Sequence, residues 1–311
     1  MNLAFVFPGQ GSQSLGMLSE LAEAEGVVRE TFAEASDALG YDLWKLVQEG
    51  PESELNATER TQPALLAAGV AVWRAFTAHA SYRPEYMAGH SLGEYTALVC
   101  AGALRFADAV KLVEFRGEAM QRAVPAGEGA MAAILGLEDE QVRAACDQAA
   151  QGEVASAVNF NSPGQVVIAG NRAAIERAIE ICKQNGAKRA LPLPVSVPSH
   201  CALMRPAAEE LAARLAETEV SAPSIKVVNN VDVAIESEPA AIRDALVRQL
   251  YSPVRWTETV RFLAANGVEG IVECGPGKVL AGLNRRIEKN MTVIAVQDRA
   301  GLDEAVAAAD R

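Results

Sequence analysis

The residues best suited to covalent chemistry are residues 89–93, which read Gly-His-Ser-Leu-Gly and fit the pattern G-x-S-x-G. The motif follows a short predicted strand, Tyr86–Ala88, and precedes a predicted helix near Leu92–Ala101. In this strand–turn–helix context the glycines permit a sharp turn that lifts the serine hydroxyl above the sheet. Unpaired backbone N–H groups at the start of the helix can stabilise an oxyanion. Ser91 is therefore the candidate nucleophile for acyl transfer, and a tight turn without a catalytic role is the alternative.

A serine hydroxyl needs a base, and histidine suits because its unperturbed pKa is about 6.5. The chain has only three histidines. His79 ends a long predicted helix and is interpreted as a surface residue, while His90 adjoins the nucleophile in a turn where neighbouring side chains diverge. His200, on a loop at a predicted domain junction, is the candidate base, with a structural histidine as the alternative. No carboxylate stands out to orient it, and a backbone carbonyl could hold the ring equally well.

Arg116 is a cation within an apolar helical stripe. Ala109, Val113, Arg116 and Met120 follow one another at spacings of four, three and four, which places them on one helix face. A buried arginine is costly unless it is paired. Its partner could be a protein carboxylate or a carboxylate on the substrate, held by the planar guanidinium. The sequence leaves these two readings equally open.

The elements that must position these residues change character along the chain. Leu3–Phe7 is a continuous apolar run typical of a buried strand, and helical periodicity dominates from about residue 18 to residue 82. Strands separated by helices predict a mostly parallel sheet. Over the middle of the chain the order is instead β-α-β-β-α-β, the ferredoxin-like pattern. We expect a catalytic domain of residues 1–125 and 198–311, interrupted by a ferredoxin-like subdomain of residues 126–197.

The individual elements follow from the same patterns. Within the insert we predict strands at 130–135, 154–159, 166–169 and 188–193, with helices at 138–150 and 172–185. Beyond it we predict helices at 203–216, 239–250 and 256–266, and strands at 225–229, 270–273 and 292–296.

Composition excludes several function classes. A net charge of -12 argues against nucleic-acid binding, and an acidic partner would need a local basic patch. The longest apolar stretch, Pro63–Trp73, is shorter than the roughly 18 residues of a membrane span, and the N-terminus lacks the basic flank of a signal peptide. Five cysteines without a CxxC pair predict reduced thiols rather than disulfides or a zinc site. We therefore expect a cytoplasmic protein without a metal.

The glycine-containing loop at residues 8–13 does not match a dinucleotide fingerprint, because Ser14 occupies the place of the third glycine. The next segment also reads as helix, with no second strand ending in an acid. We expect the loop to bring Gln10 and its backbone near Ser91.

Several motifs together resemble those of malonyl-CoA:acyl carrier protein transacylases. They are residues 9–13, 89–94, 114–117, 199–200 and 249–256, in the order of that family and over nearly the whole chain. The resemblance implies an α/β-hydrolase-like core with a ferredoxin-like insert. It also implies that Ser91 is the nucleophile, His200 the base and the main-chain carbonyl of Gln249 its orienting group. Gln10 and Leu92 would donate backbone N–H groups to the oxyanion, and Arg116 would hold the malonyl carboxylate beside Gln62, Met120 and Ser199.

The implied reaction is a ping-pong transfer of malonyl from malonyl-CoA to the phosphopantetheine thiol of acyl carrier protein, in fatty acid biosynthesis. A malonyl-serine ester is the intermediate, and no cofactor is needed because the coenzyme A thioester is itself the substrate. Acyl carrier proteins are acidic, so docking would use basic residues, although a solvated scatter of charge is an equally good reading of them. The candidates are Lys183, Lys188, Arg189, Lys278, Arg285 and Arg286.

Three other functions remain open at this point. A polyketide-synthase acyltransferase would share every motif and differ in carrier or acyl group. A serine esterase or thioesterase would use the same turn but transfer to water; the Arg116 stripe and the missing triad acid count against it. A non-catalytic interaction protein would have no reason to keep Ser91, His200 and Arg116 together.

Overall fold

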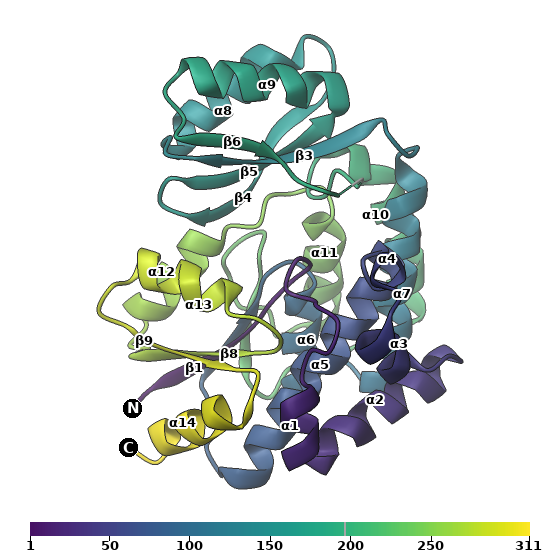
Figure 1. Cartoon of the computed structure of the whole chain (residues 1–311), viewed down its shortest axis with the longest axis vertical. Coiled ribbons are helices and arrows are strands. Elements are labelled where there is room, and N and C mark those ends of the chain that lie inside the picture. Colours follow the sequence, from purple (N-terminus) through teal and green to yellow (C-terminus); the bar gives the residue numbers. More distant parts are fainter. Residues whose placement is uncertain (196) are drawn as a thin grey trace.

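A five-stranded parallel sheet forms the centre of the larger part of the molecule (Figure 1). The computed structural model describes residues 1–195 and 197–311; residue 196, near the predicted end of the insert, lies outside the described residues. Every neighbouring strand pair in this sheet is parallel. The strand order is β7 (Lys226–Val228), β2 (Tyr86–Gly89), β1 (Leu3–Phe7), β8 (Gly270–Cys274) and β9 (Thr292–Val296).

Strand β1 is apolar throughout because both of its faces are covered. Leu3, Phe5 and Phe7 belong to one buried cluster, whereas Ala4 and Val6 belong to another on the opposite face. A strand buried on both faces is typical of a parallel sheet between helical layers. The larger cluster includes residues of α2 (Gly26–Leu39), α5 (Thr58–His79), α6 (Gly93–Cys100) and α7 (Phe106–Ala123), and the other includes residues of α12 (Trp256–Ala265) and α13 (Val279–Ile287).

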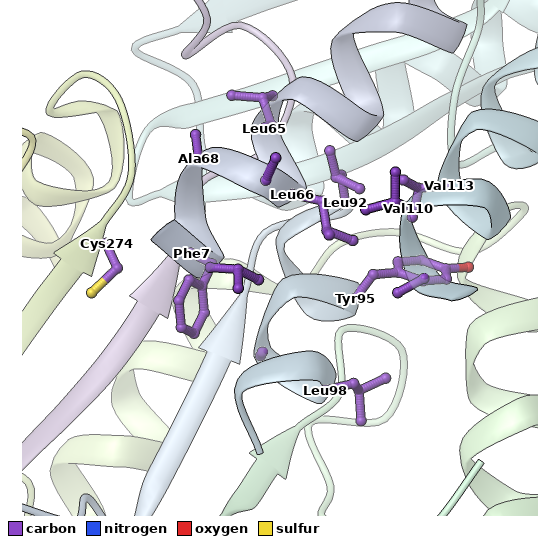
Figure 2. Close-up of a cluster of buried hydrophobic side chains, with 14 of the residues drawn as sticks. Phe7, Leu65, Leu66, Ala68, Leu92, Tyr95, Leu98, Val110, Val113 and Cys274 are labelled. Carbon is purple, nitrogen blue, oxygen red and sulfur yellow. The ribbon is translucent and has the colours of Figure 1, made fainter. Parts of the chain in front are cut away.

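The helix that follows Ser91 is anchored by this larger cluster. Figure 2 shows Leu92, Tyr95 and Leu98 at the start and along the length of α6, beside Leu66 of α5 and Val110 and Val113 of α7. Close packing fixes a helix against its neighbours. The remaining helices of this part are α1 (Ser19–Ala24), α3 (Leu43–Glu49), α4 (Glu52–Leu55), η1 (Ala202–Met204), α10 (Arg205–Glu217), α11 (Pro239–Gln249) and α14 (Arg299–Ala309).

The middle of the chain forms a second, antiparallel sheet with the predicted β-α-β-β-α-β order. Helices α8 and α9 cover its outer face at the top of Figure 1. This arrangement confirms the predicted fold class. The sheet order is β4 (Ala155–Ser162), β5 (Gln165–Asn171), β3 (Gly129–Leu135) and β6 (Arg189–Pro192), with helices α8 (Asp139–Ala150) and α9 (Arg172–Gln184).

Edge strand β4 joins the insert to the larger part. Phe160 N–H donates to the Val254 carbonyl at 3.0 Å, and Val254 N–H donates to the Val158 carbonyl at 2.8 Å. Through these bonds, Val254 of the core forms a single parallel β-bridge with Asn159 at the edge of the small sheet. The inner face of the sheet, including Met131 and Val167, packs against Cys201 of the core. The insert is thus held at a defined position above the carboxyl ends of the core strands.

None of the helices in the described part of the chain is both long enough and apolar enough to cross a membrane. All five cysteines are free thiols, and four of them are buried.

Candidate active site

Ser91 lies at the carboxyl end of β2, in a turn that only glycines permit. Its own φ is 53°, in the left-handed region. A Cβ at position 89 would lie 1.8 Å from the carbonyl carbon of Gly93, and a Cβ at position 93 would lie 2.0 Å from the carbonyl oxygen of Phe7. Both glycines are therefore required by close backbone approach, as the motif predicts. We call residues 89–93 the elbow.

The structure brings Ser91 and His200 into hydrogen-bond contact. Ser91 Oγ is 2.8 Å from His200 Nε2, and His200 Nδ1 is 2.7 Å from the main-chain carbonyl oxygen of Gln249. A carbonyl only accepts, so Nδ1 carries the proton of the neutral ring and Nε2 is free to accept from the serine hydroxyl. Burial, with help from the Arg116 charge, lowers the pKa of His200 to about 3. The imidazole is therefore neutral at physiological pH.

Two backbone N–H groups next to the hydroxyl are open to a ligand. Gln10 and Leu92 both line the cavity at Ser91. Among residues 1–195 and 197–311, neither backbone N–H has an acceptor within hydrogen-bond range. The N–H of Ser91 itself is different, because it donates to Asn230 Oδ1 at 2.7 Å. Gln10 reaches the site because the loop after β1 packs on the elbow, where a Cβ at Gly9 would lie 2.4 Å from the His90 carbonyl oxygen.

Arg116 is only 1 % exposed and has amide partners where a carboxylate was one expectation. Nη1 donates to Gln62 Oε1 at 2.7 Å, and Nη2 donates to Gln249 Oε1 at 2.9 Å and to Ser91 Oγ at 3.3 Å. No ion pair to Arg116 occurs within the described residues, and its buried Nε has no partner there either. Burial lowers the pKa of Arg116, while Tyr95 and Glu94 act in the opposite direction. Donor capacity therefore remains for a ligand.

The cavity above Ser91 encloses about 120 Å³ and lies between the core and the insert. Met131, Asn159 and Leu193 line it from the insert, and Arg116, Met120, Ser199 and His200 from the core. Gln62 does not line the cavity but contacts two residues that do: its Oε1 accepts from Arg116, and its Nε2 donates to Met120 Sδ at 3.5 Å. His90 also lines it, but its Nε2 is 2.8 Å from Asn161 Oδ1 rather than directed at the nucleophile.

Two buried polar residues of the site carry no role in the sequence-based prediction. Glu94 Oε2 accepts from Asn230 N–H at 2.9 Å and from Gln249 Nε2 at 2.8 Å. Asn230 in turn holds the elbow, since its Nδ2 donates to the Gly89 carbonyl at 2.7 Å. A signal for Asn230 was present, because it lies two residues beyond the end of β7 and loops at the carboxyl ends of parallel strands commonly build sites. The comparable signal for Glu94 was its place directly after the elbow, in the segment 89–94 that carries the family resemblance.

Comparison with known proteins places this chain in a family. Residues 4–301 match the acyl transferase domain family. The malonyl CoA-acyl carrier protein transacylase of Salmonella typhimurium is 63% identical over 303 residues, covering 97% of this chain and 98% of that relative. The relative of the same name from Bacillus subtilis is 46% identical over 305 residues, covering 98% and 96%.

Solved structures agree. The crystal structure of an acyl carrier protein S-malonyltransferase from Vibrio cholerae is 64% identical with a TM-score of 0.96, covering 98% of this chain and 100% of that one. A malonyl-transacylase in complex with a type II PKS acyl-carrier protein is 60% identical with a TM-score of 0.98, covering 99% and 100%. The fold and the family match define an acyltransferase. The chain belongs to the malonyl CoA-acyl carrier protein transacylases.

Proposed function

We propose that this chain transfers malonyl from malonyl-CoA to the phosphopantetheine thiol of acyl carrier protein, in fatty acid biosynthesis, by a ping-pong mechanism. One observation carries the proposal. The Ser91 hydroxyl lies 2.8 Å from a neutral imidazole and 3.3 Å from a buried guanidinium that has no ion-pair partner among the described residues. A nucleophile, a base and a buried cation in one cavity suit a thioester whose acyl group ends in a carboxylate.

In the first half-reaction, His200 Nε2 takes the Ser91 proton while Oγ attacks the thioester carbonyl carbon. The backbone N–H groups of Gln10 and Leu92 bind the oxyanion, and each such donor is typically worth about 3 kcal/mol. Collapse of the tetrahedral intermediate breaks the carbon–sulfur bond. The proton on His200 passes to the coenzyme A sulfur, and a malonyl ester of Ser91 remains. The Gln249 carbonyl holds the imidazolium in place during the transfer.

The second half-reaction reverses these roles. His200 takes the proton of the carrier's phosphopantetheine thiol, and the sulfur attacks the malonyl-serine ester. When the carbon–oxygen bond breaks, the proton returns from His200 to Ser91 Oγ. Throughout, Arg116 binds the malonyl carboxylate through N–H groups that Gln62 and Gln249 leave free, and Met120 and Ser199 line the acyl site. This carboxylate site counts against a serine esterase, which would also differ by transferring the acyl group to water.

Intact-mass spectrometry tests the nucleophile. After mixing with malonyl-CoA, the wild-type protein should gain one malonyl group, and Ser91→Ala should gain none because no hydroxyl is left to acylate. Ser14→Ala, which changes an exposed serine in the same protein, serves as the matched control and should be acylated normally. A stoichiometric malonyl adduct on Ser91→Ala would refute the assignment.

We further propose that the carrier docks at one end of the insert sheet. Arg189 on β6 pairs with Leu135 on β3, which pairs with Gln165 on β5, and Arg286 of α13 donates to Gln165 Oε1 at 2.8 Å. Strand spacing sets Arg189 about 10 Å from Gln165 across the sheet and about 13 Å along the chain from Leu193, the residue after β6, which lines the cavity. Exposed Lys188 adjoins Arg189. These cations could meet an acidic carrier despite the net charge of -12.

The other basic candidates are engaged or lie elsewhere. Lys183 pairs with Glu180 at 2.7 Å, and Arg285 donates to the Val293 carbonyl at 2.9 Å. Lys278 is exposed before the first residue of α13. We therefore give Lys188, Arg189 and Arg286 the main part in docking.

A polyketide carrier is the second candidate partner. A malonyl-transacylase that is 60% identical to this chain has been solved in complex with a type II PKS acyl-carrier protein, and this complex supports a polyketide carrier as the alternative partner. Presenting equal amounts of a fatty-acid and a polyketide carrier to the malonylated protein, and following both by mass spectrometry, decides between them. A clear preference for the polyketide carrier would replace the fatty-acid assignment.

Two further proposals concern organisation. Residues 126–197 form the inserted subdomain, supported by a hydrophobic cluster made wholly of insert residues. The chain works in the cytoplasm, supported by five free thiols, which suit a reducing compartment.

A further inference from the structure

Glu94 lies at the second position of α6, three residues after the nucleophile, and is 2 % exposed. Its Oε2 accepts two hydrogen bonds, from Asn230 N–H and from Gln249 Nε2. These donors come from the loop after β7 and from the last residue of α11. One carboxylate oxygen therefore connects three separate segments directly behind the reacting groups.

The first consequence concerns the side-chain amide of Gln249. Its Nε2 faces two groups that accept, Glu94 Oε2 at 2.8 Å and the Ser91 carbonyl at 3.0 Å. Its Oε1 faces Arg116 Nη2, which can only donate, at 2.9 Å. The amide orientation is thus set by its partners. A turned amide would direct an NH₂ group at the guanidinium and lose the hydrogen bond that aims Arg116.

The second consequence concerns the elbow. With its backbone N–H bound by Glu94, Asn230 directs Oδ1 to the Ser91 N–H and Nδ2 to the Gly89 carbonyl. Both bonds support the turn that holds Ser91 at a φ of 53°. This support is independent of which acyl group is bound.

An alternative role for Glu94 is to compensate the charge of Arg116. The geometry does not favour this, because no ion pair joins them within the described residues and the Gln249 amide lies between. Burial raises the pKa of Glu94 to about 7, so the carboxyl is partly neutral near physiological pH. A carboxyl oxygen accepts hydrogen bonds in either state, whereas charge compensation would be lost on protonation.

We propose that Glu94 is a positioning residue for acyl-group selection, which fixes the Gln249 amide so that Arg116 is aimed at the carboxylate of the substrate. The inference rests on the proposed function, since it requires Arg116 to bind that carboxylate. The acceptor oxygen carries the role rather than the charge. Glu94→Gln therefore retains it, because the glutamine carbonyl can accept from Asn230 and Gln249 as the carboxylate does.

The test compares kcat and KM for malonyl-CoA and acetyl-CoA as donors. Glu94→Ala should lower kcat for both donors, because the elbow loses Asn230 support. It should also raise KM for malonyl-CoA alone, lowering the malonyl-to-acetyl ratio of kcat/KM by about tenfold, the value of one hydrogen bond to a charged group. Glu94→Gln should keep the wild-type ratio. The ratio does not depend on the fraction of enzyme that is folded. If Glu94→Ala is insoluble, Glu94→Asp takes its place. Its shorter side chain draws the acceptor back, so its ratio should lie between those expected for Glu94→Ala and Glu94→Gln.

Two further variants separate the possible failures. Glu273→Ala removes another buried glutamate, which accepts from Leu280 and Ala281 N–H away from the cavity, and should keep the wild-type ratio. Arg116→Ala should collapse the ratio; if it does not, the proposed role of Arg116 fails. If Arg116→Ala collapses the ratio but Glu94→Ala and Glu94→Asp leave it unchanged, the inference about Glu94 alone is overturned. A ratio in Glu94→Gln as low as in Glu94→Ala overturns it as well, because charge would then be the cause.

Discussion

Ser91 and His200 both have left-handed backbone conformations, with φ of 53° and 63°. A non-glycine residue in that region costs about 1–3 kcal/mol, and such strain concentrates at functional sites. At Ser91 the elbow and Asn230 hold the conformation, and at His200 the backbone N–H donates to the Leu250 carbonyl at 3.0 Å. These two backbone conformations accompany the direct contact between the hydroxyl and the imidazole.

The low pKa of His200 predicts an unusual pH profile for acylation. Burial, the Arg116 charge and His90 lower it to about 3, so the neutral ring persists well below the ordinary histidine range. In single-turnover mixing with malonyl-CoA, the acylation rate should therefore not fall through loss of this base between pH 8 and pH 5.5. Circular dichroism at each pH controls for unfolding. A tenfold loss of rate per pH unit beginning near pH 6.5, with the fold intact, would contradict the assignment.

At this scale the sequence predicts residues whose type is rare or whose motif is local. His200 follows by elimination among three histidines, and Ser91 follows from its motif. The partner of Arg116 stayed open because its amide contacts come from residues 62 and 249. Glu94 and Asn230 had no predicted role because their contact joins residues separated by 136 positions. Hydrogen-bond partners that distant leave no periodic trace in the sequence.

At the scale of elements, the types and order are predicted well and the ends less well. The sequence predicts a strand at 166–169 in the small sheet, and the structure has β5 at Gln165–Asn171. Strand β4 was predicted to end at residue 159 but continues to Ser162, with register shifts between Ala157 and Asn159 and between Phe160 and Ser162. Its later residues include Asn159, at the cavity, and Asn161, bonded to His90. Polar residues placed for the site interrupt the apolar pattern that marks a strand.

The basic end of the insert sheet makes a prediction about an element rather than a residue. The double reversal Lys188→Glu and Arg189→Glu should raise KM for acyl carrier protein roughly tenfold at low salt, with a smaller effect at high salt because exposed charges are screened. KM for malonyl-CoA should change little. Lys45→Glu, an exposed reversal on α3, is the matched control. An unchanged KM for the carrier in the double variant would rule out this docking surface.

At the scale of the whole molecule, the cavity exists because the chain leaves the core after α7 and returns before η1. The insert lies over the carboxyl ends of the core strands (Figure 1). Its edge strand bonds to Val254, four residues beyond Leu250, which anchors His200. Residues 249–256 therefore connect His200 to the insert, whose residues line the cavity on the side opposite the core. Sequence predicts the insertion, but the contact between these parts follows only from the folded packing.

The buried ionisable groups set opposing pH dependences of stability. Burial raises the pKa of Glu94 and of Glu273 to about 7, above the ordinary 4.5, so each folded carboxyl stays protonated where the unfolded one is ionised. Their stabilising contribution is complete below pH 4.5 and is lost as pH rises through 7. His200 and His90, whose pKa values are lowered, act in the opposite direction and cost stability as pH falls below 6.5. The free energy of unfolding should therefore be greatest between about pH 4.5 and pH 6.5.

Glu273 isolates one part of this balance because it lies away from the cavity and caps α13 through the Leu280 and Ala281 N–H groups. Glu273→Gln cannot ionise, so it should lose less stability than wild type between pH 5 and pH 8, by at most about 3 kcal/mol, the linkage expected for a shift from 4.5 to about 7. Urea unfolding at both pH values measures the difference. Lost hydrogen bonding to the two N–H groups lowers stability equally at both pH values and cancels in the comparison. Equal pH dependence in the two proteins would mean that the Glu273 carboxyl titrates in its ordinary range, because its two N–H bonds offset the cost of burying its charge.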